Sequence, residues 1–508
     1  MRIVESGTVV GGTDRGTSGD RLARFRQLLP VLLIGTMPTA LAAQGVLGTA
    51  TTTARYIQIR PIARDTVPHS EVVVDSTGVA RWNGIPAACT PGTTVCQVYR
   101  SADVDGAVAL TQDVSFTAWG LGMQGLSATV QLRVRADAGG TFTWPRTDDR
   151  FDAMLAYAEL NRGLARVRLG RQRTLGGLGF AGFDGLSVRV DPNRFVSVEA
   201  FGGRSLARGL AEPRNEALQG LESFLPDRDA WLLGGVATVE PWPGGSVSAR
   251  YQREIWSNRS ALLTERASLE LRTDLPRGLS VSAAGDYDFA FDRIGKANAT
   301  VRVPFGARRN LWLEATARHY IPYFELWTIW GFFNPVGYNE GELQATWRPV
   351  RPLTLRAFAA RRKYGDTGTE VVFSPITDHT TRVGGGLHWL ATPALTVDGN
   401  LTLERGFGAT MSSGDVSLRW QASSALSVSV NGTAFQQIEE FRVGDGTVLG
   451  GGPGFDYTIR GRTSLQGGYN IYRQTFEGRP GVADWNQSRG WAALRIGFGR
   501  DPGRGRIR

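Results

Sequence analysis

Polar and apolar residues alternate along most of the chain, from about residue 113 to residue 498. In the stretch SATVQLRVRAD, Val130, Leu132 and Val134 fall on one side, while Arg133 and Arg135 fall on the other. Side chains of a β-strand point alternately to its two faces, so this period of two predicts a strand with one apolar and one polar face. The same alternation recurs in ERASLELRTD, LTLRAFAAR, LTVDGNLTLE and ALSVSVNGTAF.

The connections between the predicted strands alternate between short and long. Tight turns such as NRG, DPN and ATPA separate some strands, and longer segments separate the others. The longer segments cover residues 203–229, 256–262, 320–339, 364–380, 405–413, 437–455 and 478–489. This layout is typical of bacterial outer-membrane barrels, and about 9 to 11 tilted residues cross the hydrocarbon layer. We therefore predict an all-β protein with a transmembrane antiparallel up-and-down β-barrel of about 18–22 strands over residues 113–498.

A soluble β-sandwich or propeller would also alternate polar and apolar residues. The barrel is favoured because the apolar face holds many alanines and glycines, and because no repeat of about 40 to 50 residues carries a blade signature. No run of about 18 apolar residues follows residue 45, which argues against a helical membrane protein. Without such helices, only a closed barrel satisfies the backbone hydrogen bonds of a chain in lipid.

The N-terminal segment has the three parts of a secretory signal peptide. Arg21, Arg24 and Arg26 precede LLPVLLIGTMPTALA, which ends in the small-residue pattern of Ala40 to Ala42. The apolar run of about 15 residues is shorter than the roughly 20 that a spanning helix needs. Residues 1–43 are therefore predicted to be an N-terminal extension and Sec-type signal peptide, and the mature chain is predicted to reach the bacterial outer membrane.

Residues 44–112 are predicted to form an N-terminal β segment, and residues 499–508 a basic C-terminal tail. The chain has two cysteines, Cys89 and Cys96, on either side of a Pro-Gly turn. In an oxidising compartment this spacing predicts a disulfide that closes a hairpin. Three places for the segment stay open: a periplasmic subdomain, a plug in the lumen, or a surface loop.

The polar face of the predicted strands is rich in arginine. The formal net charge is +10, and nearly all of the cations are arginines. The arginines predicted to line the pore are Arg133, Arg135, Arg166, Arg168, Arg189, Arg250, Arg266, Arg272, Arg302, Arg318, Arg356, Arg460 and Arg462. Rings of arginine select anions in pores, but Glu159, Glu270 and Glu342 share the same phase, so Arg–Glu bracing of a wide barrel also stays open. Arg171 and Arg173 do not continue the alternate positions set by Arg166 and Arg168, which predicts that they lie in a loop or past a bulge.

The stretch HYIPYFELWTIWGFFNPVGYNE is unusually aromatic. Trp327, Trp330, Phe332 and Phe333 are candidates for a loop that constricts the lumen or for stacking on sugar rings. The alternative is an aromatic girdle at the membrane interface, together with packing of the loop.

Two stretches resemble known outer-membrane families. The last predicted strand, GWAALRIGFGR, resembles the terminal strand of outer-membrane proteins, whose final aromatic residue, here Phe498, is read by the barrel-assembly machinery. Residues 156–186, AYAELNRGLARVRLGRQRTLGGLGFAGFDGL, resemble Gram-negative porins of the alginate-export type, with an acidic strand followed by R-x-G-R-Q and F-D-G. The resemblance implies an outer-membrane channel for anionic solutes, without implying that alginate is the substrate.

Signs of catalysis are weak. GLGMQG at residues 120–125 matches G-x-G-x-x-G, but predicted strands on both sides make it a turn rather than a dinucleotide site. His69, His319, His379 and His388 are scattered, and no metal or cofactor is predicted. A barrel enzyme would pair a histidine with a serine or an aspartate at the barrel mouth, which sequence alone does not reveal. The chain is therefore predicted not to be an enzyme.

The predicted function is that of a porin-like channel for passive diffusion of small hydrophilic solutes, anions among them. The alternatives are a non-transporting barrel that binds at the surface or supports the envelope and, less favoured, a barrel enzyme. The predicted partners are outer-membrane lipid, the barrel-assembly machinery and the solutes, and no nucleic acid.

Overall fold

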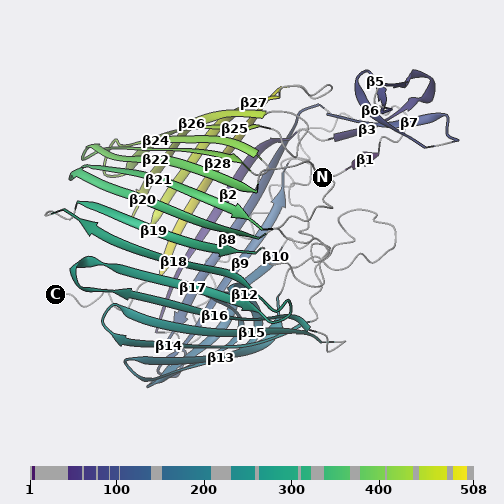
Figure 1. Cartoon of the computed structure of the whole chain (residues 1–508). Coiled ribbons are helices and arrows are strands. Elements are labelled where there is room, and N and C mark those ends of the chain that lie inside the picture. Colours follow the sequence, from purple (N-terminus) through teal and green to yellow (C-terminus); the bar gives the residue numbers. More distant parts are fainter. Residues whose placement is uncertain are drawn as a thin grey trace.

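The computed structural model arranges the chain in β-strands that form one closed barrel and one small sheet (Figure 1). It describes residues 3–5, 44–59, 62–75, 78–90, 92–101, 103–138, 151–206, 230–257, 262–306, 310–321, 337–365, 378–406, 409–438, 446–476 and 484–499. Within these ranges, no helix has the length and apolarity that a membrane crossing requires.

The barrel has 22 antiparallel strands, which confirms the predicted fold class and lies at the upper limit of the predicted strand number. The strands are β2 (Gly45–Ile59), β8 (Asp105–Trp119), β9 (Leu126–Asp137), β10 (Phe151–Arg162), β11 (Ala165–Gly176), β12 (Gly179–Asn193), β13 (Val196–Ser205), β14 (Ala230–Trp242), β15 (Gly245–Trp256), β16 (Leu262–Asp274), β17 (Ser280–Asp288), β18 (Arg293–Phe305), β19 (Leu311–Tyr320), β20 (Tyr338–Val350), β21 (Leu353–Tyr364), β22 (His379–Thr392), β23 (Leu395–Gly406), β24 (Ala409–Gln421), β25 (Leu426–Ile438), β26 (Gly446–Arg460), β27 (Thr463–Phe476) and β28 (Trp485–Gly499). A single 3-10 turn (Pro276–Gly278) joins β16 to β17.

Strand β2 closes the ring. Thr51 of β2 pairs with Arg495 of β28 on one side and with Asp113 of β8 on the other. Closure leaves no unpaired strand edge in lipid. The predicted barrel boundary at residue 113 is thereby corrected, because the barrel begins at Gly45. The segment GVLGTATTTARYIQI alternates mostly small threonines and alanines, so its two faces differ too little to reveal a barrel strand by pattern.

The two ends of the barrel differ in their connections. Turns such as 163–164 and 393–394 join strands at one end, the short-turn end, while segments such as 206–229 and 321–337 follow strands at the other, the long-connection end. Strand β2 begins and strand β28 ends at the short-turn end. Outer-membrane barrels place short turns in the periplasm and long loops outside the cell. The long-connection end is therefore the extracellular end.

The small sheet is inserted between the first two barrel strands. Its order is β1 (Ile3–Glu5), β3 (Ile62–Pro68), β7 (Val95–Ser101), β6 (Ile85–Cys89), β5 (Ala80–Trp82) and β4 (Val73–Val74), with a 3-10 turn (His69–Glu71) after β3. Because β3 follows β2 and β7 leads into β8, the sheet stands beyond the long-connection end of the barrel (Figure 1). Of the three places left open by the sequence, this one corresponds to the surface loop.

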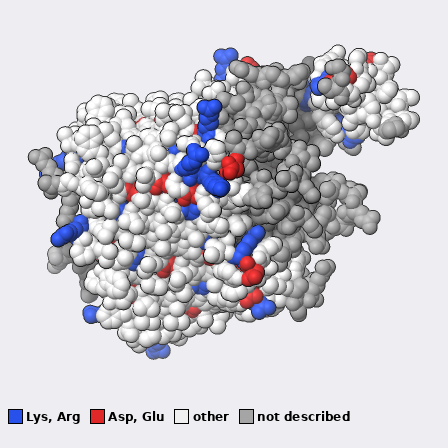
Figure 2. Space-filling model, viewed as in Figure 1, with Lys and Arg blue, Asp and Glu red and all other residues white. Residues whose placement is uncertain are grey.

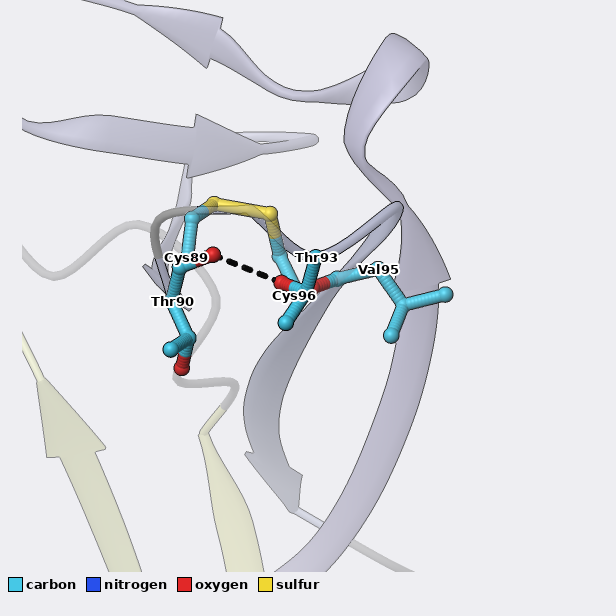
Figure 3. The surroundings of a disulfide bond; sticks show 5 residues. All are labelled: Cys89, Thr90, Thr93, Val95 and Cys96. Atoms are coloured by element: carbon cyan, nitrogen blue, oxygen red, sulfur yellow. Dashed lines mark hydrogen bonds between the residues drawn. A yellow bond between two sulfur atoms is a disulfide. The ribbon is translucent and has the colours of Figure 1, made fainter.

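A disulfide joins Cys89 and Cys96 across the paired strands β6 and β7 (Figure 3). Cys96 and Val98 are fully buried and, with Val67, form the core of the small sheet. So small a core buries little apolar surface, and the covalent link compensates by restricting the unfolded chain. The sulfurs lie near His69, but their bond to each other leaves no thiolate to bind a metal.

The outer face of the barrel is apolar. Leu269, Leu401 and Val430 are 53 to 56% exposed on it, although they belong to well-paired strands. At the short-turn end, Trp347, Trp389 and Trp420 also point outward and are exposed, as in the aromatic girdle of a membrane interface. Figure 2 shows this wall as largely uncharged, with several charged side chains beside the grey atoms at the long-connection end. Such a wall is stable in lipid and not in water, so the fold is that of a transmembrane antiparallel β-barrel.

Candidate functional site: the lumen of the barrel

Most of the arginines predicted to line the pore lie on the inner face of the barrel. They project from the strands opposite to the exposed leucines and valines, and comprise Arg133, Arg135, Arg166, Arg168, Arg189, Arg250, Arg266, Arg272, Arg302, Arg318 and Arg356. Polar residues face them from neighbouring strands, as Ser268 faces Arg250 and Glu314 faces Arg302. The inner wall is therefore polar and the outer wall apolar.

Arg460 and Arg462 lie elsewhere. Arg460 is the last residue of β26, and Arg462 lies in the turn to β27, where its Nη1 donates to the carbonyl of Gly499 at 3.1 Å. Both arginines would face the lumen if YTIRGRTSLQ ran as one strand, but Gly461 has a φ of 57° and ends strand β26. Glycine adopts such a left-handed conformation without steric cost. The two arginines are therefore at the short-turn rim and not in the wall of the lumen.

Several lumen arginines pair with acids on neighbouring strands. Arg168 Nε lies 2.5 Å from Glu159 Oε2, and Arg133 Nε lies 2.7 Å from Asp113 Oδ1. Each pair joins adjacent strands, β10 to β11 and β8 to β9 respectively. These side chains are 20 to 32% exposed, so water screens the pairs and each contributes about 1 kcal/mol or less. Such pairs have the geometry expected for bracing.

The most buried charge cluster surrounds Glu340, whose side chain is only 3% exposed. Its carboxylate accepts hydrogen bonds from Arg318, from Arg362 Nη2 at 2.7 Å and from Arg382 Nη2 at 3.4 Å. Arg318 and Arg382 also reach Glu342, at 3.0 Å each. The cluster thus links β19, β20, β21 and β22 by charge-assisted hydrogen bonds.

The sequence did not single out Arg362, Arg382 or Glu340. Arg362 lies within the run RRK at residues 361–363, where consecutive cations hide the alternation. Its phase is that of Arg356, six residues earlier on the same strand, so extending the period of two along β21 would have found it.

Four lumen arginines near the short-turn end face only neutral residues across the sheet; Arg55 and Arg489, nearer the long-connection end, do so as well. This lower arginine ring consists of Arg272, Arg356, Arg419 and Arg495. All four lie within five residues of the short-turn end of their strands. Their cross-strand neighbours are serines, threonines and a glycine, and Arg356 Nη2 donates to Asn400 Oδ1 at 3.1 Å. In the described part of the chain, none of the four makes an ion pair, so their charge remains available to a passing anion.

The tip of the β11–β12 hairpin, residues 176–179, folds into the lumen. Arg266 Nη2 donates to the carbonyl oxygen of Leu178 at 3.1 Å. A Cβ atom added at Gly177 would collide with Glu270 and Ser268, which shows how closely the tip approaches the wall. Because Arg266, Ser268 and Glu270 face the interior, the tip lies inside the barrel against β16.

An apolar cluster supports this inward fold. Ala181 and Phe183 of β12 pack with Phe201 of β13 and Leu232 of β14, and Phe183 and Leu232 are almost completely buried. The rings of Phe183 and Phe201 stack with centroids 5.5 Å apart. Strand β13 pairs with β12 only as far as Phe183, so the end of the hairpin is free to leave the wall. Burial of these side chains in an otherwise polar lumen fixes the hairpin at its base.

The sequence missed this inward hairpin. The aromatic candidates for a constriction, Trp327, Trp330, Phe332 and Phe333, lie outside the described residues, so their role stays a prediction.

The expectation for Arg171 and Arg173 was wrong, because β11 continues through both to Gly176 and places them outward with Leu169. The clue to the hairpin was the glycine-rich tip LGGLG between two strands of continuous register.

One histidine pair lies in the lumen. His388 Nδ1 is 2.6 Å from Asp398 Oδ1, with both residues about half exposed. Asp398 is the only hydrogen-bond partner of His388 among the described residues, so no hydroxyl group is positioned there as a nucleophile. The pair has the two members named in the expected signature, a histidine and an aspartate, and no hydroxyl group hydrogen-bonds to His388 among the described residues.

No protein-family model matches the chain. No curated protein matches it either. Among solved structures, a BenF-like porin from Pseudomonas fluorescens Pf-5 is similar at 11% identity over 90% of this chain and 100% of that one, with a TM-score of 0.40. The ferric enterobactin receptor of Pseudomonas aeruginosa is similar at 11% identity over 89% and 80%, with a TM-score of 0.49. The outer membrane protein opdK of P. aeruginosa is similar at 11% identity over 89% and 99%, with a TM-score of 0.38. At this identity, no residue role passes from these proteins to this chain.

Proposed function

We propose that the protein is an outer-membrane channel for passive diffusion of small hydrophilic solutes, with a preference for anions. The observation that carries the proposal is the contrast between the two faces of one closed sheet. Exposed leucines and valines cover the outside, and arginines, serines, threonines and carboxylates cover the inside. A polar inner face suits a hydrated lumen.

Sieving is assigned to the tip of the β11–β12 hairpin. The tip extends from the wall into the lumen and is held by Arg266, so it narrows the path that a solute takes. Its residues are mostly glycine and carry no charge of their own. The tip is therefore proposed to limit solute size rather than to select charge.

The preference for anions is assigned to the lower arginine ring. Elsewhere in the lumen, arginines such as Arg168 and Arg318 are neutralised by carboxylates across the sheet. The four ring arginines face neutral neighbours, and an uncompensated ring of cations attracts anions and repels cations. Bracing and selection are thus proposed for different levels of the same lumen.

Routes of export and assembly are proposed from the two ends of the chain. We propose that a Sec-type signal peptide within residues 1–43 directs export, and that the barrel-assembly machinery reads the terminal strand β28. On β28, Ile496 and Phe498 point outward and are exposed. The proposed transport is passive, requires no cofactor and involves no catalysis.

Swelling of liposomes tests the transport. Folded protein in liposomes loaded with an impermeant polymer should let small sugars and small organic acids enter, and swelling rates should fall steeply with solute size. Heat-unfolded protein in the same liposomes is the control. If folded, heat-modifiable barrel produced no more swelling than the control, a sealed, non-transporting barrel would replace this proposal.

A further inference from the structure

Three cations form a cluster on the lipid-facing wall at the long-connection end. They are Arg361 and Lys363 of β21 and Arg405 of β23, and all three are exposed. Along β23, Leu401 and Leu403 precede Arg405 on the same outward face, with 54% and 46% of their surface exposed. We call Arg361, Lys363 and Arg405 the outer basic cluster.

The cluster has the spacing of an anion site. Arg361 pairs across the sheet with Thr381, and Thr381 pairs with Arg405, so the two arginines flank one hydroxyl group. The backbones of Arg361 and Arg405 are two strand spacings apart, about 10 Å. Their two side chains are long enough to reach an anion between them. Arg361 Nη1 lies 3.2 Å from Thr381 Oγ1. Cations this close repel one another unless an anion lies between them.

Within the described part of the chain, no carboxylate pairs with Arg361 or Arg405 of the cluster. Two other cations of the outer wall do have acidic partners. Both oxygens of Asp184 accept from Arg171 at 2.7 Å, and Arg253 lies 3.9 Å from Glu265. Asp378 makes its ion pair with His379 and also interacts electrostatically with Lys363, so it compensates part of the lysine charge. The two arginines of the outer basic cluster therefore keep their charge for a ligand from outside the chain.

The height of the cluster identifies the leaflet. Leu353 at the start of β21 pairs with Trp389 of the aromatic girdle, and Arg361 follows eight residues later on the same strand. At about 3.3 Å per residue and a tilt of about 40°, these eight residues rise roughly 20 Å, which is close to the thickness of the apolar band. The cluster thus lies at the interface opposite to the girdle, on the extracellular side. In Figure 2, a group of blue side chains, with a red one beside it, lies next to the grey atoms at the long-connection end.

We propose that the outer basic cluster binds the phosphate groups of lipopolysaccharide in the outer leaflet. Guanidinium groups make two-pronged contacts with phosphate oxygens, the ammonium group of Lys363 adds a point charge, and the Thr381 hydroxyl is a further donor. The exposed Val383, Leu401 and Leu403 lie below the cluster, where the acyl chains of the same lipid would lie. The lipid would then hold β21, β22 and β23 together from outside.

Titration of the full-length folded protein in neutral detergent with purified lipid A tests the proposal. Bisphosphorylated lipid A should raise the temperature at which the barrel unfolds, and dephosphorylated lipid A should raise it much less. The double variant R361Q/R405Q should weaken binding of the bisphosphorylated lipid by about tenfold or more. The matched control R356Q/R419Q removes the same charge from the lumen and should leave this affinity unchanged.

Equal effects of phosphorylated and dephosphorylated lipid A would overturn the proposal, as would equal affinity in R361Q/R405Q and the wild type. Vesicles of phosphatidylglycerol distinguish a general affinity for anionic lipid: if they protected the barrel as well as lipid A does, the assignment to lipopolysaccharide would fail. Heat modifiability on gels establishes that each variant is folded. Should the double variant not fold, the single variant R405Q carries the same test, with an expected loss of about threefold or more.

Discussion

Arg266 Nη2 lies 3.1 Å from the carbonyl oxygen of Leu178, although 88 residues separate the two along the chain. This hydrogen bond fastens the β11–β12 tip to the inner wall of β16. Leu178 is only 5% exposed, so the tip is packed against the wall and is not a solvated loop. The Arg266 guanidinium thereby helps to hold the element that narrows the lumen.

Release of this contact should widen the channel. In the variant R266Q, the neutral amide is shorter and donates a weaker hydrogen bond, so the tip should spend more time away from the wall. We expect single-channel conductance to rise by a factor of about 1.5 to 3, with larger current fluctuations, in planar bilayers. The control R302Q removes a lumen cation that does not contact the tip. An equal rise in R302Q would assign the effect to charge alone, and a fall in R266Q would show that the tip does not obstruct the lumen.

Removal of the Glu340 charge should destabilise the barrel. In E340Q, Arg318, Arg362 and Arg382 lose their buried common acceptor and repel one another. We expect a loss of about 2 kcal/mol, the cost of breaking a buried ion pair reduced for the partial exposure of the arginines. Urea-induced unfolding in vesicles, followed by tryptophan fluorescence, measures it. The matched variant E314Q removes a lumen carboxylate that makes no ion pair among the described residues and should cost much less.

Reduction of the Cys89–Cys96 disulfide should affect only the small sheet. By the loop-closure relation, a link over this short separation stabilises the folded sheet by about 2 to 3 kcal/mol. We expect the reduced protein, and the variant C89S/C96S, to be cleaved by protease between residues 62 and 101 while the barrel stays intact. Mass spectrometry of the fragments identifies the site. Loss of heat modifiability on reduction would contradict this, because it would tie barrel stability to the disulfide.

Neutralisation of the lower arginine ring should weaken the preference for anions. The triple variant R272Q/R356Q/R419Q removes three charges that face neutral neighbours, so the ratio of chloride to potassium permeability should fall at least twofold. The variant R133Q/R168Q removes arginines that are paired with Asp113 and Glu159, and it frees their carboxylates as well. If the two variants shifted selectivity equally, the total lumen charge rather than the ring would determine it.

The barrel could be predicted from the sequence because its cause is local. Leucines and valines such as Leu132 and Val134 must face lipid, and Arg133 must not. The sequence of each strand is therefore sufficient to identify its lipid-facing and lumen-facing sides. The alternation did not assign β2 to the barrel, because its threonines and alanines are compatible with both lipid and water. The turn at Gly461 could not be predicted from the sequence, because a single glycine can either continue a strand or end it.

The site was less predictable because its contacts are distant in sequence. The approach of Leu178 to Arg266 depends on the curvature of the wall over β13, β14 and β15, which no single segment encodes. Likewise, alternation places Arg356 in the lumen but does not tell whether its neighbours across the sheet are acidic, like those of Arg318, or neutral. Register decides this, and register is a property of strand pairs.

Reversal potential under a salt gradient, measured on single channels of the wild-type protein in planar bilayers, tests the central claim most directly. A hydrated lumen with an uncompensated arginine ring predicts stable conductance steps and a reversal potential displaced toward that of chloride. Folded, inserted barrel that gives no steps, or steps with a reversal potential displaced toward that of potassium, would contradict it.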